Sequence, residues 1–248
     1  MTGTEAATSF RLAYVPGVTP DKWARTWHER VPDVPLELTV VPAAEAAEAL
    51  RSGKADAGLV RLPIDRTGLS AILLYTETTV VVIPKDHEAA GVDEVSVGDL
   101  GDYVVLHPVD DCLEWESLPG LPANERPATT ADAVALVAAG VGLLVVPQSL
   151  ARLHHRRDLT YRPMPEAPQS RVALSWPEEQ TTDLMEEFIG IVRGRTVNSS
   201  RGRAATPPAA QANQRRSESG EARKKPAAGK SGSGGTHGAK RGKPRRRA

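Results

Sequence analysis

Arg61 has the residue type and the position that best fit the binding of a small ligand. It is the cation that directly follows the apolar, strand-like segment 55–60, and a guanidinium there can hold a carboxylate through two parallel hydrogen bonds. The alternative interpretation is an ion pair with Glu77 or Asp65. His107 also follows a strand-like segment directly, and its alternative is an ordinary histidine at the edge of a loop.

The sequence holds no recognisable set of residues for catalysis or for a metal. It lacks a Gly-x-Ser-x-Gly elbow, a Walker loop and a dinucleotide fingerprint. No Cys/His spacing suits structural zinc, and the single cysteine, Cys112, excludes an internal disulfide. The adjacent acids Asp110 and Asp111 lack a partner for acid–base work and are expected in a solvated loop. We therefore expect no enzyme activity, no metal and no cofactor.

The zero net charge of this 248-residue chain hides two oppositely charged parts. Residues 196–248 hold 14 of the 31 basic residues and 2 of the 31 acids, a net charge of +12, which leaves a net charge of −12 on residues 1–195. This tail has almost no large apolar residue, so we expect it to be disordered and to contact nucleic acid without sequence preference. A solubilising tail that folds back on the acidic body is the alternative. The residues expected to contact nucleic acid are Arg215, Arg216, Arg223, Lys224, Lys225, Lys240, Arg241, Arg245, Arg246 and Arg247.

Strand-like and helix-like segments alternate along the acidic body. The first 60 residues predict three strands with a helix after each of the first two, which is typical of a parallel sheet covered by helices. A second α/β series begins with the β-branched run 78–83, and the strand-like segment 171–176 then leads back. The pattern predicts an α/β protein of two lobes with a cleft between them. Lobe 1 would span about residues 9–80 and 170–195, and lobe 2 about residues 81–169.

Four stretches, in this order, resemble the effector-binding domain of LysR-type transcriptional regulators. They are the turn Pro16-Gly17 after the first strand and the segments 50–59, 82–87 and 136–147. The resemblance covers about residues 9–195 and implies a type 2 periplasmic-binding-protein fold. Two features depart from the family pattern: we expect no winged helix-turn-helix in the roughly ten residues before the first strand, and the basic tail has no counterpart in the family.

The resemblance also implies a small-molecule site in the cleft. By position, its lining would consist of Gly17, Val18, Thr19, Pro42, Ala43, Arg61, Leu62, Pro63, His107 and Pro147. Backbone N–H groups of the helix that starts near Thr19 could hold an anionic effector. Ala43 offers no hydroxyl, however, which weakens the case for an aromatic or dicarboxylic acid.

Two further groups of residues allow a functional and a structural interpretation. Trp23 and Trp27, one helical turn apart, are either core residues or part of a homodimer interface, because the corresponding helix lies at the dimer interface in the family. The run His154–Arg157 resembles a metal or phosphate patch. Since adjacent histidines on a helix point apart, a solvated helix end is the preferred interpretation.

Together these features predict a small-molecule-sensing regulatory domain of LysR type whose basic tail contacts nucleic acid. The alternative is a nucleic-acid-associated adaptor with a vestigial cleft, and an enzyme on the same fold is the least favoured hypothesis. The first nine residues do not form a secretory signal, and no apolar run approaches the length of a membrane span. We expect a cytoplasmic protein without membrane contact.

Overall fold

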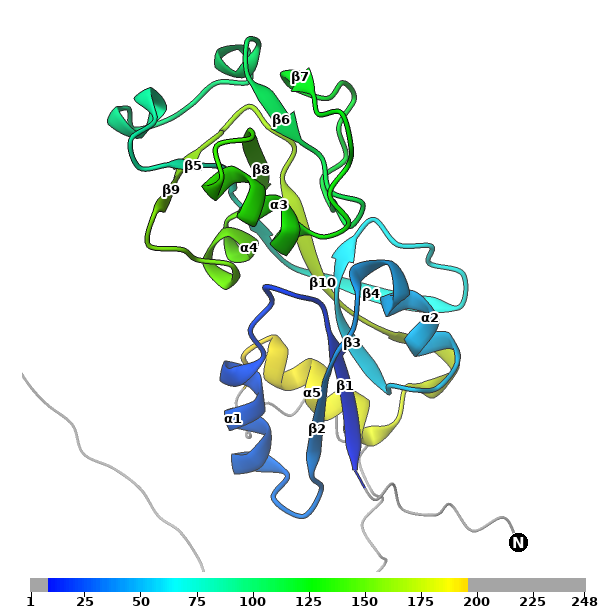
Figure 1. Cartoon of the computed structure of the whole chain (residues 1–248). Coiled ribbons are helices and arrows are strands. Elements are labelled where there is room, and N and C mark those ends of the chain that lie inside the picture. Colours follow the sequence, from blue (N-terminus) through cyan, green and yellow to red (C-terminus); the bar gives the residue numbers. More distant parts are fainter. Residues whose placement is uncertain (1–8, 196–248) are drawn as a thin grey trace, which may run out of the picture. The chain divides into compact units, whose positions relative to one another are not determined.

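Two five-stranded β-sheets form the frame of residues 9–195, the part of the chain that this computed structural model describes (Figure 1). The first sheet has the strand order β2-β1-β3-β10-β4, and the second has the order β7-β6-β8-β5-β9. The basic residues of the tail lie outside the described residues. The two sheets confirm the predicted α/β fold of two lobes.

The first sheet contains β1 (Phe10–Tyr14), β2 (Leu36–Val40), β3 (Ala57–Leu62), β4 (Leu69–Glu77) and β10 (Ser170–Pro177). The second contains β5 (Thr79–Pro84), β6 (Val104–Leu106), β7 (Leu121–Pro122), β8 (Leu143–Pro147) and β9 (Leu159–Pro163). The helices are α1 (Asp21–Arg30), α2 (Ala46–Arg51), α3 (Thr130–Ala138), α4 (Gln148–Leu153) and α5 (Asp183–Val192). Short 3₁₀ turns are η1 (Ala43–Glu45), η2 (Glu88–Gly91), η3 (Gly98–Leu100) and η4 (Glu178–Gln180).

The chain passes between the sheets twice. It leaves the first sheet after β4 and enters the second with β5, and it returns when β9 leads into β10. Strand β1 is parallel to β2 and β3, as the alternating pattern predicts, whereas the returning β10 is antiparallel to β3 and β4. Below, lobe 1 denotes the first sheet with α1, α2 and α5, and lobe 2 denotes the second sheet with α3 and α4.

An aromatic cluster fills the core of lobe 1. The rings of Phe10 and Trp27 stack with centroids 4.8 Å apart, and Phe188 of α5 packs against both. Trp27 is fully buried and donates its indole N–H to the Val34 carbonyl at 2.8 Å, and Trp23 is only 8% exposed. The structural interpretation of the two indoles is therefore correct, and their face of α1 is not an exposed dimer patch.

The β-branched residues of β5 pack into two hydrophobic cores, one on each face of the second sheet. Val80 and Val82 point to the side that α3 covers, whereas Val81 and Ile83 pack on the opposite face with Val95. Successive side chains of a strand alternate between faces, so a continuous apolar run is what a strand buried on both faces requires. No helix in the described part of the chain is long and apolar enough to cross a membrane.

Candidate ligand-binding cavity

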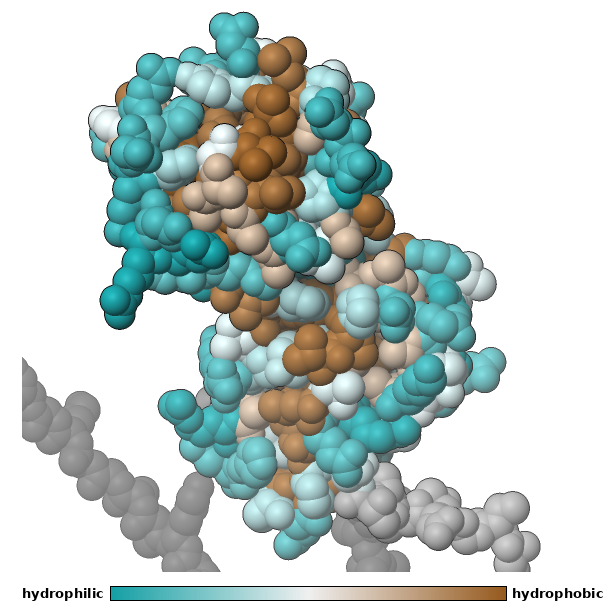
Figure 2. Space-filling view, in the orientation of Figure 1, coloured by the Kyte–Doolittle hydropathy of each residue, from teal (hydrophilic) through white to brown (hydrophobic). Residues whose placement is uncertain are grey.

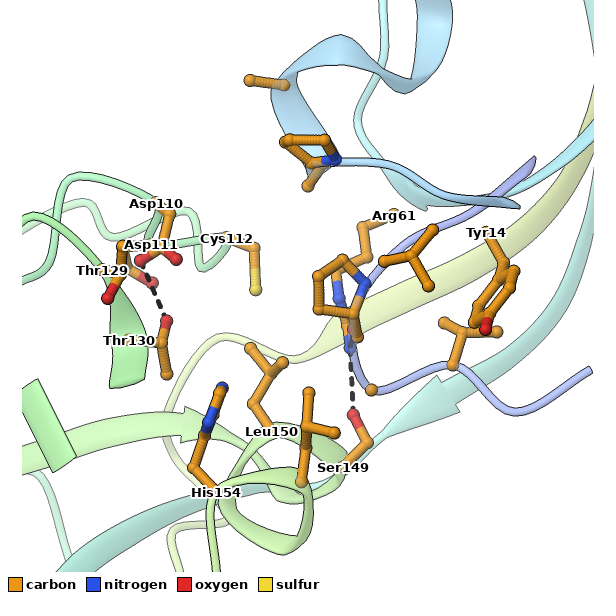
Figure 3. Close-up of a pocket in the computed structure, with 18 of the residues that line it drawn as sticks. Tyr14, Arg61, Asp110, Asp111, Cys112, Thr129, Thr130, Ser149, Leu150 and His154 are labelled. Carbon is orange, nitrogen blue, oxygen red and sulfur yellow. Dashed lines mark hydrogen bonds between the residues drawn. The ribbon is translucent and has the colours of Figure 1, made fainter. Parts of the chain in front are cut away.

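A cavity of about 1240 Å³ lies between the two lobes (Figure 3). Lobe 1 lines it with the loop between β1 and α1, strand β2, the start of η1 and the end of β3. Lobe 2 lines it with residues 109–114, the N-terminus of α3, and α4 with His154. Pockets for small molecules commonly have volumes of about 300–1,000 Å³, so this cavity has room for a metabolite.

Most of the lining expected from the sequence borders this cavity. The residues that do so are Gly17, Val18, Thr19, Pro42, Ala43, Arg61, Leu62 and Pro63. His107 and Pro147 are not part of the lining: His107 is 8% exposed, and Pro147 pairs with Thr79 inside the second sheet. Both residues directly follow or end a strand, but the chain continues past them, and Val109–Glu114 and Ser149–Leu150 form the wall instead.

Arg61 joins the two lobes through hydrogen bonds. The side chain is nearly buried, and Nη1 forms an ion pair with Glu77 and donates to Ser170 Oγ at 2.7 Å. Nη2 donates to Ser149 Oγ of α4 at 2.9 Å (Figure 3) and to the Pro16 carbonyl at 3.2 Å. The ion-pair interpretation is therefore the one observed, with Glu77 as the partner.

Gly17 allows the β1–α1 loop to lie against α4. Its φ of +84° belongs to the left-handed region, and a Cβ on this residue would come within 2.7 Å of Ser149 Oγ and 3.1 Å of Leu150 Cδ2. A side chain here would be strained and would also collide with the partner of Arg61. The glycine thus permits the close contact between the lobes at this end of the cavity.

The wall of lobe 2 carries polar groups that sequence reasoning did not assign to the site. Thr129 caps α3 by accepting a hydrogen bond from the Asp132 N–H at 3.1 Å. This leaves the buried Thr130 hydroxyl free to donate to Asp110 Oδ1 at 2.9 Å. Asp110 and Asp111 lie together beside Thr130 (Figure 3). Their place in the loop that follows β6 was the available signal, because such loops form the rims of clefts.

Burial alters the titration of two groups in this wall. Burial raises the pKa of Asp111, although a hydrogen bond from the Leu113 N–H and the nearby His107 partly oppose the shift. Burial also raises the pKa of the Cys112 thiol to about 11, with the charges of Asp111 and Asp110 adding to the effect. Cys112 is therefore a thiol at neutral pH, and the thiolate is the reactive form of cysteine.

A second, smaller cavity of about 440 Å³ contains part of the basic run His154–Arg157. His154 is the C-cap of α4, and Arg156 forms an exposed ion pair with Asp158 at 3.0 Å. Within residues 9–195, no cluster of three or more histidines, cysteines and acids is arranged to hold a metal ion. The arrangement agrees with a solvated helix end.

The chain is similar to a known protein family and to several of its members. The family model described as "LysR substrate binding domain" matches residues 5–196. A probable hydrogen peroxide-inducible genes activator of Mycobacterium avium is 34% identical over 139 residues, which cover 52% of this chain and 45% of that protein. The transcriptional regulator AlsR of Bacillus subtilis is 24% identical over 198 residues, which cover 73% of this chain and 64% of AlsR.

Among solved structures, the effector-binding domain of BenM with its effector benzoate superposes with a TM-score of 0.63 at 22% sequence identity. The match covers 75% of this chain and 90% of that domain, and it concerns the fold. The chain matches only about half to two thirds of the length of the two curated regulators named above.

Proposed function

We propose that this chain, which belongs to the LysR substrate-binding domain family, senses a small molecule and regulates transcription. The observation that carries this proposal is the 1240 Å³ cavity whose walls come from both lobes. A ligand that contacts both walls binds one relative position of the lobes better than others. Such differential affinity is what allows a ligand to shift a conformational equilibrium.

The contacts around Arg61 would transmit this shift. Its guanidinium holds Ser149 of lobe 2 and the Pro16 carbonyl of lobe 1 at one end of the cavity. Because Leu150, next to Ser149, lines the cavity, a ligand that displaces α4 would also disturb these hydrogen bonds. We propose that a homodimer or a larger regulator converts the movement into altered transcription.

The name of the mycobacterial relative raises sensing of hydrogen peroxide as a second function. The lone Cys112 argues against it, because one cysteine cannot form a disulfide within the chain. Its raised pKa also removes the thiolate that oxidation requires. Reversible binding of an effector is therefore the mechanism that we propose.

A thermal-shift screen of the full chain against metabolites tests the proposal. A ligand at 100 times its Kd should raise the free energy of unfolding by about 2.7 kcal/mol. The matched control is Ala44→Trp, which fills the cavity from an exposed position and should remove the shift while leaving the fold intact. Ligand shifts that persist in this variant, or a complete lack of stabilising compounds, would refute the cavity as the sensing site.

For the basic tail we propose nonspecific contact with nucleic acid, supported by its net charge of +12 and its lack of aromatic residues. A tail that contacts six phosphates would give a slope of log K against log salt of about −5 on duplex DNA. Fluorescence anisotropy with random duplex DNA should show binding by the full chain and none by residues 1–195. Equal DNA binding by both would assign the contact to residues 1–195. Removing the tail also separates the two hypotheses, because a sensor would still bind its ligand whereas an adaptor would lose its function.

A further inference from the structure

Unpaired negative charge lines the cavity. Four carboxylates border it, those of Asp21, Asp110, Asp111 and Glu114. Within residues 9–195 none of them takes part in an ion pair. Arg61 is the buried cation of the lining, and Glu77 already neutralises it. A carboxylate ligand would therefore be repelled by the excess negative charge of the cavity.

The two longer helices that begin at the cavity do not offer a free anion site either. A helix N-terminus favours an anion because its first N–H groups lack partners. Helix α1 has its own carboxylate, Asp21, in the first turn. Helix α3 is capped by Thr129, with Asp132 in its first turn, and Asp110 accepts from the hydroxyl of its first residue, Thr130. At α3 the protein's own groups thus occupy the place that an anionic effector would take, whereas at α1 Asp21 makes no cap hydrogen bond and disfavours an anion through its charge alone.

The remaining basic residues of the lining are Arg152 and His154, at the C-terminal end of α4. Arg152 is exposed, and its Nε donates to the Tyr161 hydroxyl at 3.4 Å, on a residue that borders the smaller cavity instead. His154 caps the C-terminus of the same helix. Asp110 and Asp111 lie beyond Cys112 from the Arg61–Ser149 contact (Figure 3). The four acids of the lining outnumber Arg152 and His154.

Apolar side chains make up much of the rest of the cavity. Leu38 and Val40 of β2 are 41% and 55% exposed, and Leu153 of α4 is 55% exposed. Hydrophobic side chains are visible on the surface of both lobes (Figure 2). An apolar ligand body would cover these exposed apolar side chains and remove them from water.

We propose that the effector is a small organic cation, an amine or amidine on an apolar body, and not a carboxylate. The inference rests on the proposed function of the cavity and specifies the ligand's chemistry. The cationic head would donate hydrogen bonds to Asp110 and Asp111, each of which has one oxygen engaged, by Thr130 and by the Leu113 N–H respectively. Charge-assisted bonds of this kind are among the stronger ones in proteins.

Ligand-observed NMR titration of the full chain with matched compounds tests the proposal. Each set has one apolar body and three heads: benzylamine, benzamide and benzoate, and the same heads on cyclohexyl and naphthyl bodies. We expect the amines to bind at least about tenfold more tightly than the matched carboxylates, the scale of one hydrogen bond to a charged group. The double variant Asp110→Asn/Asp111→Asn should lose about tenfold in amine affinity, because amides keep the internal hydrogen bonds but not the charge.

The matched control is Asp93→Asn/Glu94→Gln, which removes the same charge from two adjacent, exposed acids of lobe 2 outside the cavity. It should leave amine binding unchanged. Equal losses in both double variants, a preference for amides, or tighter binding of carboxylates would each overturn the inference. Carboxylate binding that Ala44→Trp abolishes would leave the proposed function standing. If no compound in any set binds, the inference is overturned, and the thermal-shift screen against metabolites separately decides the sensing site.

Discussion

The two walls of the cavity differ in whether their charged side chains are paired within the protein. On lobe 1, the guanidinium of Arg61 is nearly buried and uses its donors on Glu77, Ser170, Ser149 and the Pro16 carbonyl. On lobe 2, Asp110 and Asp111 line the same space without an ion pair in the described part of the chain. A charge that the protein satisfies by itself is structural, whereas a charge left unpaired at a cavity is available to a ligand.

The largest effect on stability should come from removing the paired charge of Arg61. Arg61→Met leaves Glu77 buried without its partner, so the free energy of unfolding should fall by about 3–5 kcal/mol in urea denaturation. Arg51→Met, which breaks the exposed ion pair with Asp65, is the matched control and should cost far less. Similar losses in the two variants would show that Arg61 is not held as described.

Adding Glu77→Gln to Arg61→Met tests whether these two side chains pair directly. The second substitution removes the stranded carboxylate, so the double variant should recover part of the lost stability instead of losing more. Additive losses in a double-mutant cycle would contradict the direct pairing of the two side chains.

A smaller effect is expected where the lobes touch at Gly17. Gly17→Ala should reduce stability by about 2 kcal/mol or more, since the left-handed backbone alone costs about 1–2 kcal/mol and the new Cβ must displace Ser149 Oγ. Gly53→Ala is the matched control, because Gly53 has a φ of +68° and open space around it. Its loss should be about 1 kcal/mol, from backbone strain alone. Equal losses in thermal unfolding would mean that the lobes do not meet at Gly17.

The sequence predicted the secondary-structure elements and the lobe 1 wall of the cavity, but not the lobe 2 wall. Hydrophobic periodicity located the strands and helices, and the loops after β1, β2 and β3 gave the lobe 1 lining, because ligands bind beyond the carboxyl ends of strands. The lobe 2 wall comes largely from the irregular residues 109–114, whose acids have no periodicity to place them. The partners of Arg61 are 16, 45, 88 and 109 positions away, and only the folded chain brings them together.

The smallest effect on stability should come from the unpaired wall. Burial raises the pKa of Asp111 in the folded protein, so the folded state binds this proton more tightly than the unfolded chain does. Ionised Asp111 therefore lowers stability as the pH rises through the ordinary and then the raised pKa. Asp111→Asn cannot titrate, and its stability relative to the unmodified protein should improve between about pH 4 and pH 7. Urea denaturation at both pH values checks the sign, and a relative loss at the higher pH would contradict it.

A crystal structure of the full chain with the tightest-binding amine of the matched sets tests the central claim most directly. The compound should lie in the cavity between the lobes, with its ammonium within hydrogen-bonding distance of Asp110 or Asp111 and its apolar body against Leu38 and Val40. Arg61 should keep its contacts with Glu77. A ligand bound outside the cavity, or a polar head seated on Arg61 in place of Glu77, would contradict the account.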